Sequence, residues 1–330
     1  MGLLESLVEE AARRDGSDIH LRSGEQPRVR VHREIQTISD RSLDAETVLE
    51  ILLPYLSGAE SFDANMQPEF DCAAELAGRR CRLHIFVDNR GLGAVVRLLP
   101  CVVPSIEGLR LPPVVASFAQ LPRGLVLVTG AAGAGKSSTL AAIVNQINRS
   151  RAAHIITLED PIEVLHQPSM SLVTQRQVAR DSRSFAAGLR ASLRQDPDVL
   201  LVGEMRDSET ADLVLAAAET GHLLLTTLHA GTAVQSISRM IDLFPSDRQL
   251  QARAALAESL AAVINQELCP GSEGGRIPVV EVLLATPAVR ALIREGKTHQ
   301  LEGIMQASAH LGMITRAQRI RQLREASQLA

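Results

Sequence analysis

The chain has 330 residues, of which 45% are apolar and 22% are charged, a composition that suits a globular protein with two domains. Its net charge of -4, its aromatic content of 2% and its lack of Trp argue against a nucleic-acid binder, which needs a basic face and stacking side chains. The four cysteines form no Cys-x-x-Cys pair, so neither a zinc ribbon nor a disulfide framework is expected.

The first hundred residues combine short strands with helices. The spacing of apolar residues predicts an amphipathic helix over 3–14 and a second helix over 45–56. Because helices and strands do not alternate regularly, we expect residues 1–100 to form a small α+β domain. The predicted strands are 18–21, 28–32, 70–76 and 80–87.

The start of the chain carries Glu5, Glu9 and Glu10 around short apolar groups, which fits an amphipathic helix and not a signal peptide. Elsewhere no uncharged apolar run approaches the ~18–20 residues of a membrane-spanning helix. We therefore expect a cytoplasmic protein without a membrane span.

A proline-rich segment follows the first domain, with Pro100, Pro104, Pro112 and Pro113. Proline lacks a backbone donor and biases the preceding residue toward extended conformations. We therefore expect a linker at 101–116 and a second domain at 117–330.

The second domain shows a βαβα pattern. Its apolar runs have the length and the Val, Leu and Ile content of strands that are buried on both faces, which predicts a parallel sheet. A further strand and a helical tail complete the domain. The predicted strands are 125–128, 154–158, 199–202, 223–228 and 277–284, and the predicted helices include 137–148, 208–220 and 232–241.

A glycine-rich loop follows the first of these strands and opens a helix. It reads G-A-A-G-A-G-K-S and matches the P-loop pattern G-x-x-x-x-G-K-[ST] in the context that confirms such a match. Its backbone N–H groups are expected to hold ATP phosphates, with Lys136 on the β- and γ-phosphates and Ser137 on Mg²⁺. The expected nucleotide-binding residues are Gly130, Ala131, Ala132, Gly133, Ala134, Gly135, Lys136, Ser137 and Ser138.

Two further strands end in carboxylates. Glu204 follows the strand 199–202, where an acidic side chain is suited to hold Mg²⁺ through water or to orient the nucleophile. After the strand 154–158, Glu159 and Glu163 are both candidates for the general base, and the sequence does not choose between them.

Two histidines flank the strand 223–228. His222 precedes it and His229 follows it, so we expect them at opposite ends of the strand. They cannot both contact one phosphate, and spacing alone gives neither a catalytic role.

Together these motifs resemble the secretion and pilus ATPases of the type II/type IV superfamily, and within it the PilT-type pilus-retraction ATPases. The resemblance runs from Ser17 to about Gln306 and fades in the tail. It identifies 157–163 as the Asp box, 201–207 as the Walker B segment and 219–229 as the His box, which adds His229 to the expected catalytic residues.

The resemblance implies a PAS-like N-terminal domain and a RecA-like ATPase domain in a homo-hexameric ring. It also implies that ATP lies between the two domains, where Arg82 and Arg97 reach its phosphates. Both arginines have the fixed charge and planar donors that suit phosphate oxygens. The expected partner is a pilus platform protein of the inner membrane, at whose cytoplasmic face the motor would lie.

The direction of work depends on the segment 288–295, which reads A-V-R-A-L-I-R-E and matches the retraction signature A-I-R-N-L-I-R-E at six of eight positions. Extension and secretion ATPases usually carry longer N-terminal domains and a cysteine-tetrad zinc site, which this chain lacks. The alternatives are a pilus-extension, secretion or accessory PilU-like ATPase, and a nucleic-acid translocase on the same core.

Three further expectations concern loop residues that differ from the family's usual sequence and residues expected on the surface. Ala131, Ala132 and Ala134 stand where the family has Pro, Thr and Ser, which keeps the backbone donors but removes a hydroxyl at 132. Arg290 and Arg294 are expected on an exposed polar face whose replacement costs little stability. The tail is expected to be a solvated helix, with a docking surface as the alternative, and carries Arg316, Arg319, Arg321 and Arg324.

Overall fold

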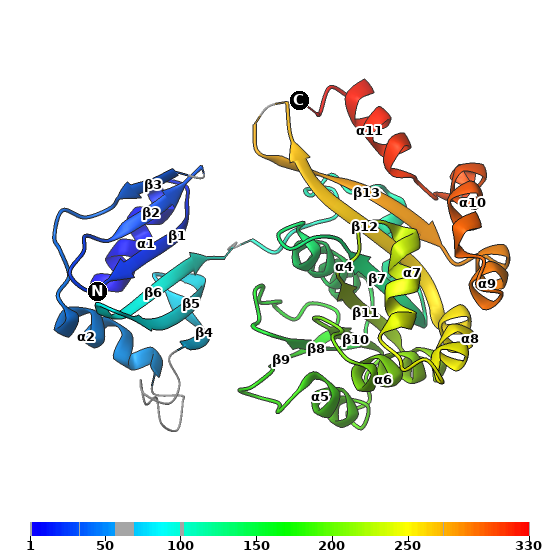
Figure 1. Cartoon of the computed structure of the whole chain (residues 1–330), viewed down its shortest axis with the longest axis horizontal. Coiled ribbons are helices and arrows are strands. Elements are labelled where there is room, and N and C mark those ends of the chain that lie inside the picture. Colours follow the sequence, from blue (N-terminus) through cyan, green and yellow to red (C-terminus); the bar gives the residue numbers. More distant parts are fainter. Residues whose placement is uncertain (1, 33, 57–68, 100–101, 273, 330) are drawn as a thin grey trace. The chain divides into compact units, whose positions relative to one another are not determined.

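The computed structural model describes residues 2–32, 34–56, 69–99, 102–272 and 274–329, which divide into two compact units (Figure 1). The first unit contains Met1–Val102 together with the short segment Pro161–Val164, and the second contains Val103–Asp160 and Leu165–Ala330. Residue 101 of the expected linker lies outside the described residues. Ile106 and Leu111, further along that segment, are buried in the core of the second unit.

The described residues of the first unit form a six-stranded antiparallel sheet in the order β3-β2-β1-β6-β5-β4, with two helices. Alternation places Ile19 of β1, Leu83 of β5 and Val96 of β6 in one core with Leu7 of α1 and Leu52 of α2. The elements are α1 (Leu3–Arg13), β1 (Gly16–Arg22), β2 (Arg28–Val31), β3 (Glu34–Thr37), α2 (Ala45–Leu56), β4 (Glu69–Leu76), β5 (Arg79–Asp88) and β6 (Gly91–Leu98).

The second unit is built on a seven-stranded sheet in the order β13-β12-β7-β11-β10-β8-β9. Every neighbouring pair is parallel except β12 and β13. The strands are β7 (Gly124–Thr129), β8 (His154–Glu159), β9 (Leu172–Gln177), β10 (Val199–Val202), β11 (Leu223–Leu228), β12 (Leu260–Pro270) and β13 (Arg276–Leu284).

Helices cover both faces of this sheet, so its central strands are buried on two sides. In β7, Leu125 and Leu127 belong to one core, whereas Val126 and Val128 belong to the core on the other face. The helices are α3 (Val114–Ser117), α4 (Lys136–Ser150), α5 (Phe185–Ser192), α6 (Ser208–Glu219), α7 (Ala233–Asp242), α8 (Gln249–Ser259), α9 (Pro287–Arg294), α10 (Leu301–Ala307) and α11 (Arg316–Glu325).

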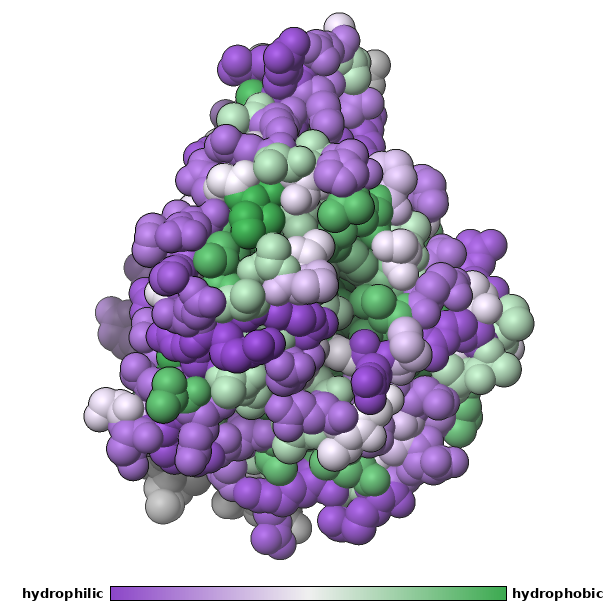
Figure 2. All heavy atoms as spheres, turned by 90° about the vertical axis from the view of Figure 1, so that its right-hand side faces the viewer, coloured by the Kyte–Doolittle hydropathy of each residue, from purple (hydrophilic) through white to green (hydrophobic). Residues whose placement is uncertain are grey.

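The predicted fold class is confirmed: an α+β unit precedes a parallel-sheet unit that ends in helices. The expected helix of the tail is present as α11, and Arg316, Arg321 and Arg324 are exposed on it. One side chain departs from a solvated helix: Leu323 is 2% exposed and packs against Ile277 and Val279 of β13. Figure 2 faces the side of the second unit where α8, α9 and α10 lie, and there apolar side chains interrupt a mostly hydrophilic surface. Within the described ranges, no helix is both long and apolar enough to cross a bilayer.

Candidate functional site

The glycine-rich loop joins the end of β7 to the start of α4. Gly130, Gly133 and Gly135 adopt positive φ angles of 144°, 73° and 85°, conformations that residues with a Cβ rarely adopt. A Cβ at Gly130 would lie 2.2 Å from the carbonyl oxygen of Gln266, so β12 leaves no room for one. The backbone path of the loop therefore accounts for its three glycines.

Lys136 is the first residue of α4, and its amine points back across the loop. Its Nζ donates hydrogen bonds to the carbonyl oxygens of Gly130 at 3.0 Å and Ala131 at 2.9 Å. Burial lowers the pKa of Lys136, and the negative charge of Glu204 partly offsets that effect. The amine is thus held at the mouth of the loop within the electrostatic reach of Glu204.

A residue that the sequence did not reveal holds the loop from behind. Gln266 of β12 is 2% exposed; its Oε1 accepts a hydrogen bond from Thr139 Oγ1 at 2.7 Å, and its Nε2 donates to the carbonyl of Ala134 at 2.5 Å. The adjacent Asn265 donates to Thr129 Oγ1 and to the carbonyl of Ala230. The available signal was the polar run 265–267 within a mostly apolar stretch.

Glu204 lies just after β10, and its two carboxylate oxygens have different partners. Oε2 accepts from the guanidinium of Arg206 at 2.8 and 2.9 Å, and Oε1 lies 3.1 Å from Nε2 of His229. The structure therefore brings Glu204 and His229 together. His222 lies before β11 and makes its contact with the carbonyl of Ala217, so the prediction that the two histidines flank this strand is confirmed.

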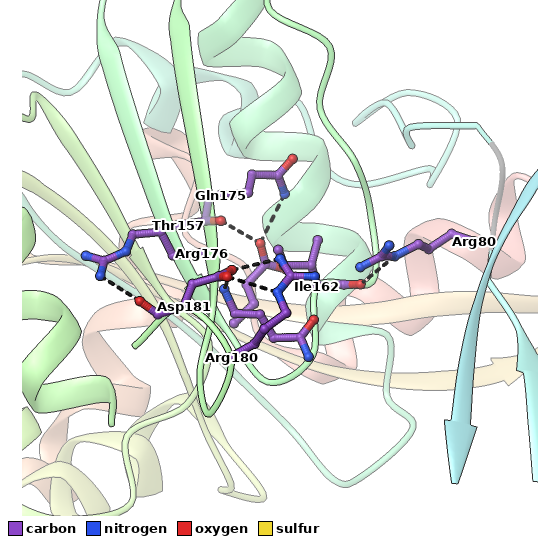
Figure 3. Close-up of polar contacts among 9 residues, drawn as sticks. Arg80, Thr157, Ile162, Gln175, Arg176, Arg180 and Asp181 are labelled. Atoms are coloured by element: carbon purple, nitrogen blue, oxygen red, sulfur yellow. Dashed lines mark hydrogen bonds and ion pairs between the residues drawn. The ribbon is translucent and has the colours of Figure 1, made fainter. Parts of the chain in front are cut away.

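Glu159 ends β8, the strand beside β10. Its Oε1 accepts hydrogen bonds from Thr157 Oγ1 at 2.6 Å and from Gln175 Nε2 at 3.2 Å, and Figure 3 shows Thr157 and Gln175 directed to the same point. A Cβ at Gly203 would lie 3.5 Å from Glu159 Cα, so Glu159 is near the residue that precedes Glu204. Glu163 is half-buried in the segment that groups with the first unit, and the structure does not choose between the two carboxylates.

The two predicted phosphate-binding arginines lie opposite each other in the first unit, on β5 and β6. Arg82 pairs with Asp71 at 3.3 Å, and Arg97 pairs with Asp18 at 2.7 Å. Burial acts to raise the pKa of Asp18, but hydrogen bonds from Arg97 and Ser17 outweigh it, and the pKa is lowered. Carboxylates therefore compensate two like charges that would otherwise repel each other across the strands.

A cavity of about 470 Å³ lies beside the glycine-rich loop. This volume is within the range of small-molecule sites. Its lining comes from the start of α4, from β12 and β13 with their connecting turn, and from the segment before α3. The lining residues include Gly135, Ser138, Thr139, Gln266, Gly274, Gly275, Arg276, Gly108 and Arg110.

The protein ligands available for a metal ion are few. No group of three His, Cys, Asp or Glu side chains in the described part of the chain is arranged to hold a metal ion. Near the loop the available ligands are the exposed hydroxyl of Ser137 and the carboxylate of Glu204. Two hard oxygen ligands fit Mg²⁺, which binds one or two protein groups together with substrate phosphates, and they do not fit a zinc site.

Comparison with known proteins gives consistent matches over nearly the whole chain. The family described as "Type II/IV secretion system protein" matches residues 1–327, which includes the tail where the resemblance was expected to fade. The type IV pilus retraction ATPase PilT of Pseudomonas aeruginosa is 42% identical over 92% of this chain and 89% of its own length. The type IV pilus ATPase PilU of the same organism is 39% identical over 97% of this chain and 84% of its own length.

A solved structure matches as well. The crystal structure of the pilus retraction motor PilT with bound ADP superposes with a TM-score of 0.89 at 37% identity, and the match covers 100% of this chain and 95% of that one. The two-unit architecture is therefore shared with a nucleotide-bound protein.

Proposed function

The chain belongs to the type II/IV secretion system protein family, and we propose that it is an ATP-hydrolysing motor that drives retraction of type IV pili. One observation carries the ATPase assignment. A glycine-rich loop with Lys136 at its mouth follows β7, and Glu204 follows β10, which is separated from β7 only by β11 in the same parallel sheet. This arrangement brings a cation for phosphate oxygens and a carboxylate for metal or water to one edge of the sheet.

In this proposal the loop residues 130–138 bind the nucleotide phosphates through backbone N–H groups and the Lys136 amine. The amine exchanges its two carbonyl partners for phosphate oxygens when ATP enters. The cavity beside the loop, with Thr139 and Gln266 in its wall, receives the ribose and base.

Mg²⁺ would be held by Ser137 and Glu204, and when bound it would neutralise charge that develops on the phosphates. Glu204 shares its carboxylate with Arg206 and His229, which fix its orientation. Glu159 or Glu163 accepts a proton from the attacking water. Arg82 and Arg97 supply fixed positive charge to the phosphates when they exchange Asp71 and Asp18 for them.

Assembly as a homo-hexamer and work on a pilus platform protein at the inner face of the cytoplasmic membrane complete the proposal. Retraction is favoured over the PilU-like alternative by the helix α9, whose sequence matches the retraction signature at six of eight positions. Because the two named relatives differ by only three percentage points of identity, 42% against 39%, similarity alone does not separate the two roles.

A deletion strain of the source organism tests the direction of work. Loss of a retraction motor should leave cells with abundant pili that do not retract and no twitching. The unaltered gene should restore twitching, and a Glu204→Gln copy should not. Bald cells would show that the protein extends pili, and unchanged pili with normal twitching would remove it from pilus dynamics.

A further inference from the structure

The C-terminal segment 315–329 contacts both sides of the cavity beside the glycine-rich loop, although its own residues are absent from the lining. It consists of α11 and the few residues after it. The sequence favoured a solvated helix here over a docking surface, so contacts with the rest of the second unit were unexpected.

The first contact holds the segment that precedes α3. Nη2 of Arg319 donates to the carbonyl oxygen of Arg110 at 2.5 Å. Arg110 lines the cavity and has a φ of 55°, a left-handed conformation that is unusual for a residue with a side chain. Such a conformation persists where surrounding contacts impose it, and the guanidinium of Arg319 is one of these contacts.

Arg319 is half-buried on α11. Burial lowers the pKa of its guanidinium, and its Nε is buried without a hydrogen-bond partner among the residues that the structure describes. Removal of a charged group from water is costly unless it gains strong partners, so this placement indicates that the contact with Arg110 matters to the fold of the segment.

The second contact holds the turn between β12 and β13, which contributes Gly274 and Gly275 to the cavity. Ser272 donates its backbone N–H to the carbonyl of Gln328 at 3.0 Å and its hydroxyl to the carbonyl of Ser327 at 2.6 Å. Leu329 pairs with Gly271 as an isolated bridge. The end of the chain therefore closes on the same turn that forms one side of the cavity.

A third contact is made with β12. Arg316 pairs with Glu267, the residue that follows Gln266 in β12. Leu323 anchors the helix by packing against β13. One short segment thus holds the two lining segments and the strand that braces the glycine-rich loop.

From these contacts we infer that the C-terminal segment 315–329 sets the shape of the nucleotide cavity, with Arg319 as a positioning residue for the base and ribose. This inference rests on the proposed ATPase function. Arg319 does not touch the phosphates in this arrangement; it acts through the backbone of Arg110. It should therefore affect ligands that fill the cavity and spare those that occupy only the loop.

The test compares two ligands on the purified full chain by isothermal titration calorimetry. ADP fills both the loop and the cavity, whereas tripolyphosphate reaches the loop alone. Loss of one charge-assisted hydrogen bond in Arg319→Ala should weaken ADP binding about tenfold and leave tripolyphosphate binding unchanged. Arg319→Lys, which keeps one donor, should recover part of the ADP affinity.

Arg321→Ala is the matched control, because Arg321 lies on the same helix with its side chain 82% exposed and paired to Glu325. It should bind both ligands as the wild type does. Equal weakening of ADP and tripolyphosphate in Arg319→Ala, or no change in either, would overturn the inference. A wild-type chain that binds neither ADP nor tripolyphosphate would overturn the ATPase assignment and this inference together. If the wild type binds both ligands and Arg319→Ala binds them equally well, only the inference is overturned.

Discussion

Gln266, which holds the glycine-rich loop through a hydrogen bond to the carbonyl of Ala134, gives the sharpest prediction. Gln266→Met keeps the approximate volume of the side chain but removes both hydrogen bonds, to the hydroxyl of Thr139 and the carbonyl of Ala134. Gln266 is 2% exposed and Thr139 is 1% exposed, so water does not replace the lost partner. Each buried group left unsatisfied costs about 1–3 kcal/mol, so the loss of both partners would cost about 2–6 kcal/mol. If Thr139 regains a bond within its own helix, only the carbonyl of Ala134 is left, and the expected loss is about 1–3 kcal/mol.

The loss of these hydrogen bonds in Gln266→Met should also weaken nucleotide binding. The loop would no longer be held in its binding conformation, so ADP affinity should fall by about tenfold as well. Thermal unfolding with and without ADP measures both effects. Gln251→Met is the control, since Gln251 is exposed on α8 and its replacement should change neither.

A double-mutant cycle with Thr139→Ala separates the shared bond from the rest. Residues in direct contact should show a coupling energy of about 0.5–3 kcal/mol. A Gln266→Met protein with wild-type stability and wild-type ADP affinity would refute the bracing role, and additive single changes would refute the bond to Thr139.

Three further predictions follow from the structure. Glu204→Gln should retain ADP binding while the rate of ATP hydrolysis falls by about 10²–10³-fold, because the charge that positions metal or water is lost. Glu209→Gln is the control, since Glu209 is exposed. A Glu204→Gln enzyme with normal turnover would remove Glu204 from the site. Burial lowers the pKa of His166 from 6.5 to about 4, so the unfolded chain binds more protons between these values, and stability should fall by up to about 3 kcal/mol as pH drops through that window. In unfolding experiments from pH 7 to pH 4, His166→Leu should reduce the dependence of the free energy of unfolding on pH. An unchanged pH dependence would contradict the lowered pKa of His166. Arg290→Ala should lower the free energy of unfolding by about 2–3 kcal/mol, because the guanidinium of Arg290 donates to the carbonyls of Ala257, Glu258 and Ala285. Arg294→Ala should lower it by about 0.5 kcal/mol or less, because Arg294 makes an exposed ion pair. Equal losses in the two variants would contradict this difference.

The last of these predictions corrects an expectation from the sequence. The pattern placed Arg290 and Arg294 on one exposed face, and a replacement of both was expected to cost little. In the structure Arg294 is exposed, but Arg290 is half-buried and binds the last carbonyls of α8. Helical periodicity predicts which face of α9 carries Arg290, but it does not predict that the C-terminal end of α8 packs there. The sequence therefore could not reveal the hydrogen bonds between Arg290 and α8.

The parallel core was predictable because its strands are buried on both faces and read as continuous apolar runs. The strands 154–158 and 223–228 were found within one residue of β8 and β11. In contrast, β12 was missed because it follows α8 directly and contains Asn265, Gln266 and Glu267, which lower its strand signal. One of these polar residues, Gln266, holds the glycine-rich loop, so the missed strand and the missed functional residue have one cause.

The small strands of the first unit show the same limit. All four residues of β3 are exposed, so no alternation marks it, and β6 carries Gly91 and Gly93, which weaken strand propensity. Without β6, the pairing that sets Arg82 opposite Arg97 was not foreseeable. The identities of the predicted site residues came from local motifs and the family resemblance, whereas Asp71 and Asp18, the partners of Arg82 and Arg97, depend on how the strands pair.

The most direct test of the ATPase claim is phosphate release by the purified chain with Mg²⁺ and ATP, measured beside Lys136→Ala. Lys136 supplies the cation at the mouth of the loop, and Lys297, the other lysine of the sequence, serves as the control in Lys297→Ala because its exposed side chain pairs with Glu295. The account predicts steady hydrolysis by the wild type and by Lys297→Ala, and a loss of about 10²–10³-fold or more in a folded Lys136→Ala protein. Undiminished phosphate release by folded Lys136→Ala would contradict it.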